Sequence, residues 1–359
     1  MWDLAVREDD YAAASSMVSR MKSPPPSMEI LLTFARGDSA SRAAIVERAR
    51  GLDSRQSQIG ARYVATFLKD FAAAESLARL DLQERRSPAI RVGAQTFLAW
   101  LELARGRWSA SKAAFAAAER MDESTPLLTH RAMAAALPFL AVPRSDLESV
   151  RSELAAWNPG AEASAPNAGL AIRLQPHLRL YLLGLLSARL GDQPSAARFV
   201  AEIEQTEAPQ EARDVTRGLA QTVRADIAAQ SGRIAPTAPA DRSGAIPLEL
   251  VSVRLFTNAR EYTLEHARYL HVLQLNAKEQ HSEALRWIET SFQGAPSEIV
   301  YLAPMHLLRG EIYERLGERQ KALDNYRRFV SLWRDCDAAL RSRVDQAQLA
   351  ITRLERRTG

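Results

Sequence analysis

Residues 302–333, LAPMHLLRGEIYERLGERQKALDNYRRFVSLW, form the stretch from which the fold is predicted. Apolar residues recur every three or four positions along it, which is the period of an amphipathic α-helix. Gly317 stands where a helix ends on a left-handed residue. The apolar positions before and after this turn are Leu308, Ile312, Tyr313 and Leu316, then Ala322, Leu323, Tyr326, Phe329 and Val330. The stretch therefore predicts two helices that bury their apolar faces against each other.

This hairpin resembles the tetratricopeptide repeat (TPR), which carries Gly-x-x-Tyr on its first helix and Ala-x-x-x-Phe on its second. Gly310 and Tyr313 match the first pair, and Ala322 and Tyr326 match the second with Tyr in place of Phe. Arg309 stands where the pattern has Leu, and no Pro closes the unit. The resemblance implies an all-α fold, an α-solenoid in which TPR-like helix-turn-helix pairs stack into a right-handed superhelix.

Other stretches repeat this layout, as they must if one hairpin cannot bury its own core. Residues 90–121 and 175–205 give the clearest further pairs, and the length of 359 residues allows about nine to ten pairs of about 34 residues each. Residues 6–21 resemble the turn and second helix of a unit whose first helix is missing or reduced to a stub. We therefore expect an abnormal beginning or a piece of a longer protein.

The sequence predicts two helical arrays. The first covers residues 1–157 and the second residues 170–359. Residues 158–169 between them are small and proline-bearing, which predicts a loop. Within the second array, residues 233–247 carry prolines where a helix belongs, and residues 335–357 are expected to form a charged terminal capping helix.

Composition favours a soluble, cytoplasmic protein without bound cofactor. Apolar residues make up 47%, and no apolar run approaches the roughly 20 residues that cross a membrane. The single cysteine, Cys336, excludes an internal disulfide framework and a cysteine zinc site. The formal charge is only +4, and cations alternate with acidic residues along most helices, so we expect no nucleic-acid partner.

Catalytic motifs are absent from the sequence. It contains no phosphate-binding loop, no dinucleotide fingerprint, no nucleophile elbow and no zinc-protease motif. His266 and His271 share a predicted helix, but their spacing of five residues points them to different faces, so we expect no metal there. We therefore predict that the chain is not an enzyme.

Recognition is the mechanism that such an architecture offers. The first helix of every pair lines the inner surface of a superhelix, and this groove holds a peptide or a partner protein. Aromatic and arginine side chains contribute most binding energy at interfaces. The groove candidates on this reasoning are Tyr63, Trp100, Tyr181, Arg189, Tyr269, Glu311 and Arg315. For each aromatic residue, a place in the core is the alternative.

Residues 256–354 also resemble the last repeats of TPR regions that are appended to bacterial serine/threonine protein kinases or transcriptional regulators. The resemblance implies a regulatory or partner-binding region of a larger bacterial signalling protein. Two hypotheses follow. The first is a non-catalytic interaction scaffold, and the second is a ligand or peptide sensor in which binding near residues 233–247 changes the curvature of the superhelix.

Overall fold

The computed structural model describes residues 2–51, 54–122, 127–165, 167–230, 260–289 and 297–356. Every regular element in these ranges is helical, and they contain no β-strand, so the predicted all-helical fold class is confirmed for this part of the chain. The chain divides into two compact units. The first unit comprises residues 1–126 and 293–300, and the second comprises residues 127–292 and 301–359.

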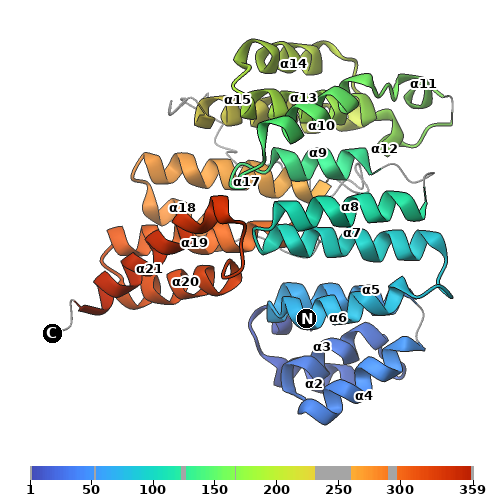
Figure 1. Cartoon of the computed structure of the whole chain (residues 1–359), viewed down its shortest axis with the longest axis vertical. Coiled ribbons are helices and arrows are strands. Elements are labelled where there is room, and N and C mark those ends of the chain that lie inside the picture. Colours follow the sequence, from blue (N-terminus) through green and yellow to red (C-terminus); the bar gives the residue numbers. More distant parts are fainter. Residues whose placement is uncertain are drawn as a thin grey trace. The chain divides into compact units, whose positions relative to one another are not determined.

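The first unit is built mainly of helices that follow one another along the chain (Figure 1). They are α1 (Trp2–Arg7), α2 (Tyr11–Ser19), α3 (Pro26–Arg36), α4 (Ser39–Arg50), α5 (Ser54–Tyr63), the π-helical turn η1 (Val64–Leu68), α6 (Phe71–Arg79), the 3-10 turn η2 (Leu80–Leu82), α7 (Pro88–Ala104) and α8 (Trp108–Met121). Trp100 of α7 and Phe115 of α8 meet edge to face with ring centroids 5.9 Å apart, so this helix pair shares an aromatic core.

The second unit continues the same kind of organisation. Its helices are α9 (Leu128–Ala136), α10 (Arg144–Ala156), α11 (Gly160–Ala163), α12 (Leu170–Arg173), α13 (Gln175–Arg189), α14 (Gln193–Gln205), α15 (Arg213–Gln230), α17 (Arg260–Ala277), α18 (His281–Glu289), α19 (Leu302–Arg315), α20 (Arg319–Leu332) and α21 (Arg341–Arg356). The 3-10 turns η3 (Gln210–Ala212) and η5 (Ala338–Leu340) precede α15 and α21, and η4 (Ile299–Tyr301), whose first two residues are assigned to the first unit, precedes α19. Phe139 lies at the centre of an aromatic cluster in this unit, with ring centroids 5.3 Å from Tyr269, 5.2 Å from Tyr301 and 6.4 Å from Trp333.

One turn geometry recurs in both units. Within the described ranges, six helix pairs are joined through a residue in the left-handed conformation, with φ between 56° and 76°. These residues are Asp9, Lys69, Gly106, Gly191, Glu279 and Gly317. In five of these turns the next residue donates its backbone N–H to the carbonyl five positions earlier, at 2.8–2.9 Å, which is the Schellman closure of a helix end. The turn predicted around Gly317 is thus one of several turns of the same geometry in the described residues.

A small, fully buried residue follows each of these turns at the same distance. The residue after the left-handed position accepts a hydrogen bond through its carbonyl oxygen from the N–H four residues on. The donors are Ala14, Ala74, Ser111, Ala196, Ala284 and Ala322, and each side chain is completely buried. Because protein interiors are close-packed, a larger side chain here would push the helices apart.

Several predicted segment boundaries differ from the boundaries of the observed helices and units. Residues 158–169, expected to be a loop between two arrays, lie inside the second unit and include the single turn α11. Residues 335–357 were expected to form one helix, but α21 begins only at Arg341 after η5. Leu349 of this helix is 67% exposed. Residues 233–247 lie outside the described ranges.

None of the helices in the described ranges combines the length and the apolar character that spanning a bilayer requires.

Candidate functional site

The predicted groove residues of the first unit contribute to its core. Tyr63 is partly buried, and its ring lies 5.6 Å from that of Trp2 and 5.7 Å from that of Phe67. Trp100 is 2% exposed and packs on Phe115. The prediction that the Trp100 ring lines an open surface is therefore wrong, because neighbouring helices cover α7 on more than one side.

The predicted aromatic residues of the second unit are buried as well. Tyr181 in α13 is completely buried, and Tyr269 in α17 is 7% exposed and packs against Phe139 and Tyr301. Ten of the eleven positions 178–188 in α13 are buried, so this helix has no free aromatic face. The prediction that Tyr181 and Tyr269 are accessible is therefore wrong, because packed neighbouring side chains bury both rings.

The predicted charged residues remain partly accessible. Arg189 donates to the carbonyl oxygen of Leu140 at 2.8 Å, and Arg315 donates to the side-chain oxygen of Asn276 at 2.8 Å. Burial raises the pKa of Glu311, while Arg315 and Arg343 act in the opposite direction. Burial also raises the pKa of Tyr269 to about 12, and Glu311 adds to this shift. In the second unit, Tyr269 is thus buried, Arg189 and Glu311 are half-buried, and Arg315 is exposed.

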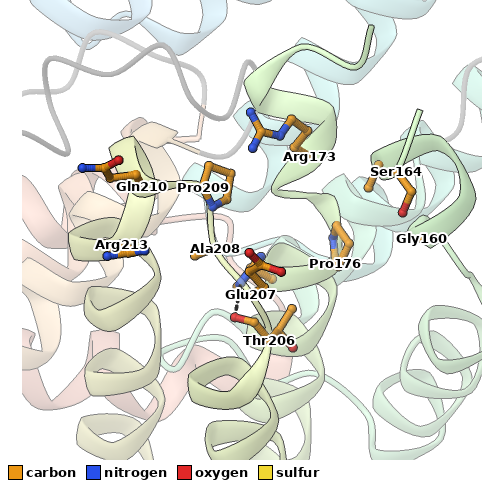
Figure 2. A pocket seen from close by; sticks show the side chains of 12 residues that line it. Gly160, Ser164, Arg173, Pro176, Thr206, Glu207, Ala208, Pro209, Gln210 and Arg213 are labelled. Atoms are coloured by element: carbon orange, nitrogen blue, oxygen red, sulfur yellow. Dashed lines mark hydrogen bonds between the residues drawn. The ribbon is translucent and has the colours of Figure 1, made fainter. Parts of the chain in front are cut away.

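A cleft of about 580 Å³ opens elsewhere in the second unit, where α13 and α15 begin. The turns α11 and α12 and the connection from Thr206 to Pro209 complete its walls. Figure 2 shows Gln210 and Arg213 on one side of the cleft and Gly160 and Ser164 on the other, with Glu207 between them. This size suits a small ligand or a few residues of an extended chain.

His177 is a buried polar residue in the wall of the cleft. Its side chain is 1% exposed, and Nε2 lies 3.3 Å from the carbonyl oxygen of Thr206. A carbonyl only accepts, so Nε2 carries the hydrogen and Nδ1 is left as an acceptor. Nδ1 is buried and has no hydrogen-bond partner. Burial lowers the pKa of the imidazole and so favours the neutral ring. The hydrogen bond to the Thr206 carbonyl acts in the opposite direction but is the smaller effect.

The charged residues of the cleft are carried by separate elements. Arg173 ends α12 and Arg213 begins α15, and both are exposed. Glu207, on the connection after α14, is the one acidic side chain among the lining residues that the structure describes. Among the described lining residues, the cleft thus presents two cationic groups and one anionic group beside the starts of two long helices.

The cleft was not predicted from the sequence. Residues 158–169 were assigned to a loop, and nothing in the helical period shows that they lie beside α13 and the start of α15. Pro176 and Pro209 gave a usable signal, because proline favours the first turn of a helix and so marks where helices begin.

The described residues offer limited means for chemistry. No group of three His, Cys, Asp or Glu side chains in these ranges could hold a metal ion. In the cleft, the Thr206 hydroxyl donates to the carbonyl of Glu202 at 2.7 Å. Burial raises the pKa of the Cys336 thiol, which disfavours the reactive thiolate.

Comparison with known proteins gives no relative for this chain. No protein-family model matches the sequence, and no curated protein or solved structure matches it.

Proposed function

We propose that the chain is a non-catalytic binding module made of TPR-like helical hairpins, and that the cleft beside α13 and α15 holds a short segment of a partner protein. The repeated hairpin turn and its fully buried small residue support the TPR-like class. We infer that the module serves regulation within a larger bacterial signalling protein of the cytoplasm, as the sequence resemblance implies.

The observation that carries the proposal is the open cleft itself. Its walls come from elements that span residues 160–213, and their positions are fixed by packing of α13 against α14 and α15. A site supported by rigid helices binds with little loss of conformational freedom in the protein. Backbone amides of an extended segment would meet the polar groups of the walls, while Pro176 and Pro209 offer apolar contact.

A peptide-display selection on the immobilised full chain tests the proposal. Peptides that are enriched on the unaltered chain are then measured against two variants, one in α11 and one at the residue that follows it. Ser164→Trp places a bulky ring at an exposed lining position, whereas Ala161→Trp adds the same ring at an exposed position of α11 that does not line the cleft.

We expect micromolar peptide binding, at least about tenfold weaker for Ser164→Trp and unchanged for Ala161→Trp. Circular dichroism and unfolding curves establish that both variants keep the fold. If no peptide is enriched, or if the enriched peptides bind Ser164→Trp as tightly as the unaltered chain, the proposal is wrong.

A further inference from the structure

We propose that the aromatic pocket around Phe139 is a second peptide-binding site, and that the chain's own connection between α9 and α10 occupies it in this structure. The ligand class that fits is an extended segment in which Phe is followed by an aliphatic residue. Such a segment of a partner protein would take the places of Phe139 and Leu140. This inference goes beyond the proposed function, because the pocket shares none of its residues with the described lining of the cleft.

The connection that fills the pocket enters the interior of the second unit at two residues. Phe139 and Leu140 are 1% and 3% exposed, whereas Ala141 and Pro143 directly after them are exposed. Loops normally run over the surface, because a buried loop carries backbone polar groups that need partners. A short loop that turns inward at two residues and then returns to the surface is held in the manner of a bound peptide.

Three aromatic rings from separate elements surround the Phe139 ring. Tyr269 of α17 and Tyr301 of η4 meet it edge to face, with ring centroids 5.3 Å and 5.2 Å away. Trp333, which follows α20, lies 6.4 Å from it. Edge-to-face contacts orient a ring and add to the gain from burial. The pocket therefore favours an aromatic side chain over an aliphatic one.

Two arginine side chains bind the backbone of the connection. Arg343 of α21 donates to the carbonyl oxygen of Phe139 at 3.2 Å, and Arg189 at the end of α13 donates to that of Leu140 at 2.8 Å. Hydrogen bonds to consecutive main-chain groups provide affinity in peptide recognition, and a side-chain pocket provides specificity. The second unit presents both to the same dipeptide.

Residues that the sequence predicts for a groove meet at this pocket. Arg189 and Tyr269 contact the connection directly, and Glu311 of α19 interacts electrostatically with Tyr269 and Arg343. These residues come from three helices that are separate in the sequence. On this proposal, Tyr269 is buried because a segment of the chain itself stands in the place of a ligand.

The connection competes with a partner segment because it is tethered at both ends. A tethered ligand acts at an effective concentration that reaches about millimolar for short linkers. The apparent affinity of a free peptide is reduced by the fraction of molecules whose pocket is already filled. Removal of the Phe139 side chain empties the aromatic pocket and removes most of this competition.

Fluorescence anisotropy tests the inference with a labelled peptide of the sequence AALPFLAVP, residues 135–143. It is titrated with the unaltered full chain, with Phe139→Ala and with Phe97→Ala. Phe97 in α7 is 4% exposed, so its truncation leaves a similar cavity outside the pocket and is the matched control. Circular dichroism and unfolding curves establish which variants keep the fold.

We expect Phe139→Ala to bind the peptide in the micromolar range, at least about tenfold more tightly than the unaltered chain or Phe97→Ala. A peptide with Ala in place of its Phe should bind Phe139→Ala at least about tenfold more weakly. Ser164→Trp, which obstructs the cleft, should leave the binding of this peptide unchanged. The result is thus independent of whether the proposed function holds.

Hydrogen exchange on the unaltered chain gives a second measurement that does not depend on the stability of a variant. Millimolar peptide should displace the connection and raise the exchange of the amides of residues 137–142 by about threefold or more, with no change in α7. The inference is wrong if a folded Phe139→Ala binds the peptide no better than Phe97→Ala, or if the peptide with Ala binds equally well. If Phe139→Ala does not fold, unchanged exchange at residues 137–142 overturns it.

Discussion

A Cβ atom added to Gly310 in α19 would stand 2.7 Å from the ring of Tyr326 in α20, closer than side-chain carbons approach each other. Gly310→Ala therefore forces the ring or the helix to move, at a cost of about 1–3 kcal/mol. This cost exceeds the gain of about 1 kcal/mol from the better helix propensity of alanine. We expect lower stability in chemical unfolding. Gly93→Ala in α7 is the control, because its nearest neighbour is 3.5 Å away, and it should stabilise the protein.

The non-glycine residues in the left-handed turns give a second prediction. Glu279, at φ 60°, occupies the place that Gly317 has at φ 74°. A left-handed residue with a Cβ costs about 1–2 kcal/mol, so Glu279→Gly should stabilise the protein by about 1 kcal/mol. Gly317→Ala should destabilise it by a similar amount, although no other atom lies within 4 Å of the added Cβ. Gly51→Ala, outside the left-handed region, should show no such loss, and an equal loss there would contradict this interpretation.

The buried Asp226 in α15 predicts a dependence of stability on pH. Burial raises the pKa of its carboxyl to about 7, and the nearby Arg189 and Gln230 lower it only in part. A folded pKa above the unfolded one favours the protonated form in the native state. The contribution of this group is therefore fully favourable below about pH 4 and is lost as pH rises to about 7.

We expect Asp226→Asn to remove this loss. The difference in unfolding free energy between the variant and the unaltered chain should grow by roughly 2–4 kcal/mol from pH 4 to 7 and stay constant above pH 7. Parallel urea titrations at several pH values measure the difference. A difference that does not change with pH would show that Asp226 ionises normally in the folded protein.

The buried pair of His266 and Tyr301 gives a fourth prediction. Nδ1 of His266 lies 2.9 Å from the Tyr301 hydroxyl, and burial lowers the pKa of the imidazole to about 3. Tyr301→Phe removes the hydroxyl that is hydrogen-bonded to the buried His266 imidazole. This change should lower the free energy of unfolding by about 1–2 kcal/mol at neutral pH. Tyr269→Phe, in the same aromatic cluster, is the control and should cost less than about 0.5 kcal/mol. Equal costs in thermal unfolding would exclude a contribution of the His266 contact.

The hairpins could be predicted from the sequence because their determinants are local. Gly317 and the residues around Ala322 specify a turn and a close helix contact within a short stretch, and α19 and α20 begin and end close to the expected positions. In the predicted pair at residues 175–205, Gly191 and Ala196 occupy the same turn and contact positions.

Accessibility could not be predicted in the same way. Helical period shows which face of α13 pairs with α14, but it does not show that other helices cover the remaining faces around Tyr181. One signal was present, since residues 178–188 are apolar almost all round, which is typical of an enclosed helix. The cleft was even harder to predict from the sequence, because Arg173, Glu207 and Arg213 come from three segments whose proximity depends on tertiary packing.

The recurring turns affect how the chain reaches its native state. Five of the six are closed by a hydrogen bond between residues only five positions apart, and in all six the small contact residue follows within the next helical turn. Contacts between residues near in sequence cost little loop entropy, and proteins dominated by them fold fast. Individual hairpins can therefore form while synthesis of the chain is still under way, and each completed one gives the next a surface on which to assemble.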